Sequence, residues 1–194
     1  MTATLRPIIF ARYPVPGRCK TRLIPALGPE GAAGLHRRLV ERTLAELASL
    51  HPVVAATGAD TQAFRDWLGS DVDVVPQSGG DLGARMLAAG TPGPSVIVGS
   101  DIPGIDAAAV ASAMTLLAGH DLVLGPAEDG GFWLIGWRQP DARLFGGVEW
   151  GSARALADVE ANARHLGLAT AHADTRADLD RPEDLARWPD LVTP

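Results

Sequence analysis

The sequence contains a single cysteine, a single lysine and a single tyrosine in 194 residues. A lone cysteine cannot form an intrachain disulfide, which is typical of proteins from a reducing compartment. No apolar run approaches the roughly 20 residues that a membrane-spanning helix needs. The first residues also lack the apolar core and cleavage site of a secretory signal. We therefore expect a cytoplasmic protein that has no membrane partner.

Charge is unevenly distributed along the chain. The formal net charge is −6, yet residues 1–29 carry five basic side chains and no acidic one, which leaves a strongly acidic remainder. Such a body lacks the broad basic face of a nucleic-acid binder, so we expect no nucleic-acid partner. A compact basic segment suits a small polyanion such as a nucleotide phosphate tail. The alternative is a solvated basic turn, and charge alone does not separate the two.

The one lysine is Lys20, in a chain that has 16 arginines. In a chain that uses arginine at every other basic position, a single retained lysine indicates that its side chain has a chemical role. Arginine does not replace the compact ammonium of lysine where a point charge must reach a phosphate.

The length suits one domain, residues 1–194, and 46% apolar against 21% charged residues is an ordinary globular balance. Short β-branched runs alternate with helical patterns. Strands are expected at Pro7–Ala11, Pro52–Thr57, Val72–Val75, Ser95–Gly99, Leu122–Gly125, Phe132–Gly136 and Leu168–Ala171. Helices are expected at Pro29–Leu50, Asp60–Leu68, Leu82–Ala89, Asp106–Ala118, Ser152–Leu166 and Pro182–Arg187. This alternation predicts a single-domain, three-layer α/β/α fold with a mostly parallel sheet.

Several common site motifs are missing. Lys20-Thr21 lacks the glycines of a phosphate-binding Walker loop, and no Gly-x-Gly-x-x-Gly follows the first strand. The five histidines have no zinc spacing, so each is expected at the surface or at a helix end. Cys19 lies between two cations that would lower a thiol pKa, but a nucleophilic role is the minor alternative.

Ligands of open α/β sheets bind beyond the carboxyl ends of the strands, so the segments that follow strands are candidates for the site. After the first strand, a Pro16-Gly17 turn is surrounded by four cations, which can wrap a di- or triphosphate. These cations are Arg12, Arg18, Lys20 and Arg22, and the loop that carries them is expected at the surface.

Two aspartates fit a metal that binds phosphates. Asp101 follows the fourth strand, and Asp180 lies in an acidic cluster near the C-terminus. One or two carboxylates plus phosphate oxygens are the usual ligands of Mg²⁺ in nucleotide sites. Asp101 and Asp180 would serve if their strands are neighbours. Capping of the next turn or helix is the alternative role for each.

Five motifs in order resemble a known superfamily over nearly the whole chain. They are Arg18-Cys19-Lys20-Thr21-Arg22-Leu23, Ser100-Asp101-Ile102-Pro103, Gly80–Met86, Glu128–Leu134 with Trp150-Gly151-Ser152, and Asp178–Leu185. The chain resembles nucleotide-diphospho-sugar transferases of the GT-A-like fold. Within them it is similar to the radical-SAM/selenodomain-associated transferase 1 family, which is linked to arsenosugar biosynthesis. It is more distantly similar to 2-phospholactate and molybdenum-cofactor guanylyltransferases.

The resemblance implies roles for individual residues. The nucleotide and its phosphates would contact Arg12, Gly17, Arg18, Lys20, Arg22, Gly79, Gly80 and Arg85. The acceptor side would comprise Asp129, Gly130, Gly131 and Trp150. Asp101 and Asp180 would hold Mg²⁺ or Mn²⁺, and Lys20, Asp101 and Asp129 would be catalytic. Asp129 is as easily a turn residue as a base, and Trp137 is expected in the core.

The resemblance also implies an enzyme, a transferase whose partners are a nucleotide and a small-molecule acceptor. The fourth strand ends in one aspartate and not in the Asp-x-Asp of glycosyltransferases, which favours nucleotidyl transfer. We therefore expect transfer of a guanylyl-type group from a nucleoside triphosphate to a small phosphorylated or acidic acceptor, with release of pyrophosphate. Glycosyl transfer from a nucleotide sugar and a catalytically idle nucleotide-binding protein are the alternatives.

Overall fold

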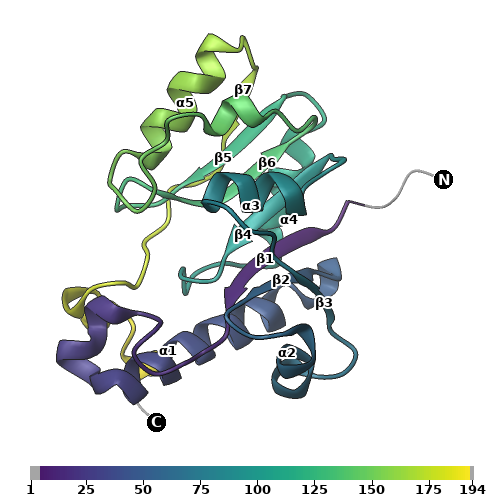
Figure 1. The fold of residues 1–194 in the computed structure, drawn as a ribbon. Helices are drawn as coiled ribbons and strands as arrows, with labels where there is room; N and C mark the ends of the chain where they lie inside the picture. Colours follow the sequence, from purple (N-terminus) through teal and green to yellow (C-terminus); the bar gives the residue numbers. More distant parts are fainter. Residues whose placement is uncertain (1–4, 193–194) are drawn as a thin grey trace.

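The computed structural model describes residues 5–192, and its strands form one sheet in the order β3-β2-β1-β4-β6-β5-β7 (Figure 1). The strands are β1 (Pro7–Arg12), β2 (Val53–Thr57), β3 (Asp73–Pro76), β4 (Ser95–Gly99), β5 (Leu122–Pro126), β6 (Phe132–Trp137) and β7 (Thr170–His172). β6 runs antiparallel to its neighbours β4 and β5, and the other strand pairs of this sheet are parallel. The predicted mostly parallel sheet is confirmed.

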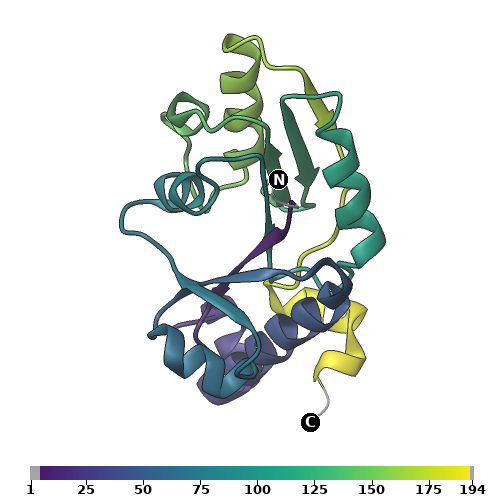
Figure 2. The ribbon, with the colours of Figure 1, turned by 90° about the vertical axis from the view of Figure 1, so that its right-hand side faces the viewer.

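Helices cover both faces of the sheet, so the predicted three layers are confirmed (Figure 2). The α-helices are α1 (Ile24–Glu46), α2 (Thr61–Leu68), α3 (Leu82–Ala89), α4 (Ala107–Leu116), α5 (Ala155–His165) and α6 (Pro189–Val192). Short 3-10 helices are η1 (Thr21–Leu23), η2 (Ala48–Leu50), η3 (Ala142–Phe145) and η4 (Pro182–Arg187). Among residues 5–192, no helix is long and apolar enough to cross a membrane.

Several helices differ from the prediction in their bounds. The helix expected at Ser152–Leu166 spans Ala155–His165, and the one expected at Asp106–Ala118 spans Ala107–Leu116. The helix expected at Pro29–Leu50 begins earlier, at Ile24, and is broken at Gly28, whose φ of 70° only glycine adopts easily. It also ends earlier, at Glu46, where a 3-10 turn follows. The helix expected at Pro182–Arg187 is found with these bounds, and it is a 3-10 helix. Asp106 caps α4 as predicted, because its carboxylate accepts a hydrogen bond from the amide of Ala109.

The core consists of alternate strand residues on the two faces of the sheet. Ile9 and Ala11 of β1 pack on the side of α1, α2 and α4, while Ile8 and Phe10 face α3 and α5. Trp137 is 2% exposed and lies in the second of these cores, as predicted. Because β1 and β4 are parallel neighbours, the loops that follow them leave the same edge of the sheet.

Candidate functional site

The segment after β7 returns across the carboxyl edge of the sheet and reaches the loop after β4. The amide of Glu128 donates to the carbonyl of Arg176, and the amide of Leu179 donates to the carbonyl of Asp101, at 3.0 and 3.2 Å. This return places Asp180 beside Asp101, although β7 and β4 are not neighbours in the sheet. The predicted meeting of the two aspartates is therefore found, but the predicted reason, adjacent strands, is wrong.

Arg176 holds the returning segment in place, and the sequence motifs did not single it out. Its guanidinium donates to the carbonyl of Gly104 and, at 3.2 Å, to Asp106, and it lies over the Trp133 ring at 5.1 Å. These contacts fasten the return to the loop after β4 and to β6. Only three-dimensional proximity reveals this role, because the partners are far apart in the sequence.

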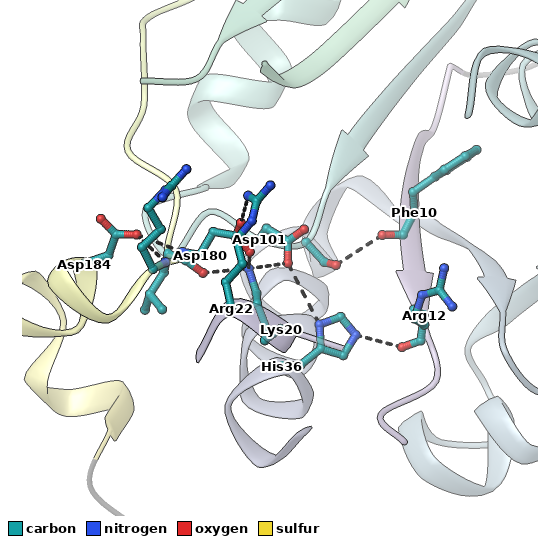
Figure 3. A network of polar contacts seen from close by, with 11 residues as sticks. Phe10, Arg12, Lys20, Arg22, His36, Asp101, Asp180 and Asp184 are labelled. Atoms are coloured by element: carbon teal, nitrogen blue, oxygen red, sulfur yellow. Dashed lines mark hydrogen bonds and ion pairs between the residues drawn. The ribbon is translucent and has the colours of Figure 1, made fainter. Parts of the chain in front are cut away.

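Lys20 is buried at the centre of the site and is not on the surface of its loop (Figure 3). Its side chain is only 3% exposed, and its Nζ lies 2.7 Å from Asp101 Oδ1, 3.7 Å from Asp180 Oδ1 and 2.6 Å from the carbonyl oxygen of Leu179. A left-handed backbone at Lys20, with φ 46°, turns the side chain inward. The expectation that Lys20 is exposed in a surface loop is therefore wrong. Its burial is possible because three oxygen atoms surround the ammonium and replace the water that it loses.

Two further side chains complete this network. Arg22 donates to Asp180 at 2.5 Å, so it contacts a carboxylate in this structure. His36 of α1 is buried, lies 2.9 Å from the carbonyl oxygen of Arg12 and has its Nδ1 3.9 Å from Asp101 Oδ1. The prediction that each histidine lies at the surface or at a helix end is wrong for His36. Its helical position alone gave no indication of this contact.

A basic pocket of about 290 Å³ lies on one side of Lys20. We define it by four cations, Arg12, Arg18, Lys20 and Arg85, which line it together with His36 and Gln77. Arg12 and Arg18 are exposed, and Arg85 donates to the Gln77 side chain at 2.9 Å. Four of the predicted phosphate contacts thus lie around one cavity, which has the size and charge for a phosphate tail.

Three predicted nucleotide residues are glycines that do not line this pocket. Gly17 has a φ of 77° and forms the turn in which the amide of Arg18 donates to the carbonyl of Val15. Gly80 has a φ of 98° and, with Gly79, lies in the exposed connection that leads to α3. Their visible role is to set the path of the two loops.

An acidic pocket of about 310 Å³ lies on the other side of the Lys20 network. We define it by four aspartates, Asp101, Asp129, Asp178 and Asp180, and Phe132 and Trp150 also line it. Asp101 and Asp180 line both pockets. Asp178 belongs to the acidic cluster seen in the sequence, but its place in the site was not predicted.

The residues predicted for the acceptor side have a visible structural role. Asp129 Oδ1 accepts from the amide of Gly131 at 2.9 Å, so the predicted turn role of Asp129 is present. Gly130 has a φ of 87° and lies directly against the backbone of Ala153. Trp150 packs against Phe132, with ring centroids 6.3 Å apart. Asp129, Phe132 and Trp150 all line the acidic pocket.

The local electrostatics differ among the ionisable groups. Desolvation of the half-exposed Asp101 carboxylate opposes its ionisation, but the Lys20 ammonium and its hydrogen bond outweigh this effect, so the pKa of Asp101 is lowered. Burial, and then the nearby carboxylate of Asp129, raise the pKa of Asp178. Burial also raises the pKa of Cys19, which outweighs the effect of its cationic neighbours. The expected lowering of that thiol pKa is wrong.

The donor set at Asp101 and Asp180 fits a divalent cation that also binds phosphate. The Oδ1 atoms of both aspartates face one ammonium, that of Lys20. The Asp101 side chain is 56% exposed, and within the described chain its Oδ2 accepts no hydrogen bond. No group of three or more histidine, cysteine, aspartate or glutamate side chains suited to a metal occurs within residues 5–192. A metal here would therefore need phosphate oxygens or water as further ligands, as Mg²⁺ in nucleotide sites does.

Comparisons with known proteins show which fold and which family the chain shares. No curated protein shares significant sequence similarity with the chain. A solved structure from Desulfovibrio desulfuricans G20, described as a "putative nucleotide-diphospho-sugar transferase", is 30% identical over 97% of this chain and 88% of its own, with a TM-score of 0.88. A Methanothermobacter nucleotidyl transferase is 16% identical over 98% of both chains, with a TM-score of 0.62. The inositol-1-phosphate CTP transferase of T. maritima is 12% identical over 99% of this chain and 96% of its own, with a TM-score of 0.55.

A family model also matches residues 40–152, that of DUF2064, described as "Uncharacterized protein conserved in bacteria". This match begins within α1, contains β2 to β6 and ends at Ser152, and thus covers more than half of the chain. The narrower transferase subfamily that the sequence motifs suggest stays a prediction. The chain belongs to the DUF2064 family and has the nucleotide-diphospho-sugar transferase fold.

Proposed function

We propose that this protein is a nucleotide-dependent transferase that moves a nucleotidyl group from a nucleoside triphosphate to a small acceptor. One observation carries the proposal. A basic pocket and an acidic pocket meet at Asp101 and Asp180, at the carboxyl edge of the sheet. Such a pair of cavities holds a polyanionic donor and a second substrate on either side of one reacting centre.

The donor would lie in the basic pocket. Arg12, Arg18 and Arg85 would contact its phosphates, and forked guanidinium contacts would fix their orientation. Asp101 and Asp180 would hold Mg²⁺ or Mn²⁺, which when bound neutralises charge on the phosphates. Lys20 would hold the two carboxylates at a fixed separation, because its ammonium already bridges them. Its contact with phosphate stays a prediction.

The acceptor would lie in the acidic pocket, within reach of Asp129 and Asp178. In the transfer step, an acceptor oxygen forms a bond to the α-phosphorus of the donor. The bond from that phosphorus to the leaving oxygen breaks, and pyrophosphate departs with the electron pair. The acceptor proton passes to a pocket carboxylate, and the raised pKa of Asp178 suits that role. Positioning and electrostatics would supply most of the catalysis.

Glycosyl transfer is the second candidate. The Desulfovibrio structure described as a nucleotide-diphospho-sugar transferase has 30% identity to this chain, well above the nucleotidyl transferases compared here. In this reaction the acceptor oxygen bonds to the sugar carbon of a nucleotide sugar, and a nucleoside diphosphate leaves. The single aspartate after β4, in place of Asp-x-Asp, supports nucleotidyl transfer as the first choice.

A donor panel tests the two reactions. The full chain is incubated with four nucleoside triphosphates or with a set of nucleotide sugars, each with Mg²⁺ and a mixture of small hydroxylated acceptors. Release of pyrophosphate from a triphosphate is expected. Release of a nucleoside diphosphate from a nucleotide sugar, with no pyrophosphate in any sample, would contradict nucleotidyl transfer and favour the second candidate.

Binding of the donor is measured separately by thermal shift. Nucleotide with Mg²⁺ should raise the melting temperature, because a ligand that binds only the folded state stabilises it. Stabilisation without turnover of any donor would favour a nucleotide-binding protein over an enzyme. No stabilisation by any nucleotide would contradict the proposal as a whole.

A further inference from the structure

The charged side chains that line the acidic pocket disfavour the binding of anions. Four aspartates line it, and within the described chain Arg22 is its sole cationic lining residue. Arg22 is already engaged, since it donates to Asp180 at 2.5 Å. An anionic acceptor would therefore enter without a free cation to pair with, and close like charges oppose binding.

A metal on Asp101 and Asp180 would not remove this bias. Those two carboxylates also border the basic pocket and already face Lys20. The other two, Asp129 and Asp178, line the acidic pocket and not the basic pocket. These two carboxylates would remain opposite the acceptor.

The remaining lining suits a ring that carries hydroxyl groups. Phe132 and Trp150 form an aromatic wall, with their ring planes at 74° to each other. Carboxylates accept hydrogen bonds from hydroxyl groups, and aromatic side chains pack against the apolar face of a sugar ring, as in other small-molecule pockets. A cavity of about 310 Å³ accommodates one such ring.

We propose that the acceptor is an uncharged polyhydroxylated molecule of the monosaccharide class, and that the acidic pocket rejects its phosphorylated and carboxylated relatives. This inference rests on the proposed function, because it concerns the acceptor side of the same site. It differs from the sequence-based expectation of a phosphorylated or acidic acceptor. Asp129 and Asp178 select the uncharged molecule by accepting from its hydroxyl groups and by repelling anions.

Matched pairs of sugars test the selection directly. Glucose, mannose and galactose are each compared with their 6-phosphates, and glucose also with glucuronate. Binding to the full chain is measured by saturation-transfer NMR, with and without nucleotide and Mg²⁺. At least one uncharged sugar should bind about tenfold or more tightly than its charged partner, since about 1.4 kcal/mol of repulsion corresponds to tenfold.

Variants locate the selection in the pocket. Asp129→Asn with Asp178→Asn keeps the shape of both side chains and removes both charges, so the preference should fall to within about threefold. Glu183→Gln is the matched control. It removes one exposed acidic side chain from the same C-terminal segment, and Glu183 lines neither pocket. This control should keep the full preference.

The outcomes separate this inference from the proposed function. Tighter binding of a phosphorylated or carboxylated sugar overturns the inference, and so does a failure of all three uncharged sugars to bind. A preference that survives in the double variant also overturns it, because the aspartates would then not be its cause. Nucleotide binding is measured on the same samples, so a chain that binds nucleotide but prefers anionic sugars retains the proposed function and loses only this inference.

Discussion

The ammonium of Lys20 lies 2.7 Å from a carboxylate oxygen of Asp101, and the Lys20 side chain is only 3% exposed. The contact joins the loop after β1 to the loop after β4, and the same ammonium faces Asp180 from the returning segment. One buried cation thus holds together three segments that are remote in the sequence. Removal of that cation would leave two carboxylates that repel each other.

Substitution of Lys20 by arginine should impair both the fold and the activity. A guanidinium is larger and planar, and it does not fit the three acceptors that surround the ammonium. We expect the free energy of unfolding to fall by about 1–3 kcal/mol and kcat/KM to fall by on the order of 10²-fold. Urea denaturation and steady-state kinetics measure the two effects. Arg138→Lys, at an exposed position outside both pockets, is the control. Wild-type behaviour of Lys20→Arg would show that the single lysine is an accident of composition.

Asp101→Asn should abolish the part of nucleotide stabilisation that depends on Mg²⁺. A neutral amide binds a hard cation poorly, so we expect the apparent affinity for Mg²⁺ to fall about tenfold or more. The Lys20 ammonium lowers the pKa of Asp101 against the desolvation of the carboxylate, so the ionised form also stabilises the fold at neutral pH. The melting temperature without ligand should therefore fall slightly.

The relevant quantity is the difference in melting temperature with and without Mg²⁺ at saturating nucleotide. Asp174→Asn, on the returning segment but outside both pockets, should keep this difference. An unchanged difference in folded Asp101→Asn would exclude Asp101 from the metal site.

Asp178→Asn should stabilise the protein in a pH-dependent way. Burial first, and Asp129 second, raise the pKa of Asp178 above its ordinary value of 3.8. A carboxyl group whose pKa is higher in the folded state destabilises the fold where it is ionised, and the cost disappears when it is protonated in both states. The variant should melt at a higher temperature than the wild type at pH 7, and the gain should vanish as the pH falls below 3.8. A gain that is equal at both pH values would have another cause.

Gly130→Ala should destabilise the turn of the acidic pocket. Gly130 has a φ of 87°, and a Cβ at this position would collide with the backbone of Ala153. The left-handed backbone and the collision together should cost about 2–3 kcal/mol of unfolding free energy. Gly119→Ala is the matched control, because a Cβ there meets nothing within 4 Å. Equal stability of the two variants in urea denaturation would show that the turn moves freely.

The sequence predicted much of the fold because the relevant information is local. Most strands are short apolar runs, and the side-chain cap of Asp106 acts on an amide three residues away. The break at Gly28 was missed, and the 3-10 type of the helix at 182–187 was not specified, since small differences in backbone energy decide between helical forms.

The sequence by itself determined the alternation of strands and helices, the cluster of cations after β1 and the aspartate at the end of β4. Only the tertiary structure decided which of these groups meet. The return of the chain after β7 brought Asp178 and Asp180 to the site, and the packing of α1 brought His36 to Asp101. Lys20 is buried for the same reason, because its three acceptors come from distant segments. Charge, burial and pKa depend on such long-range neighbours, and no local pattern in the sequence specifies them.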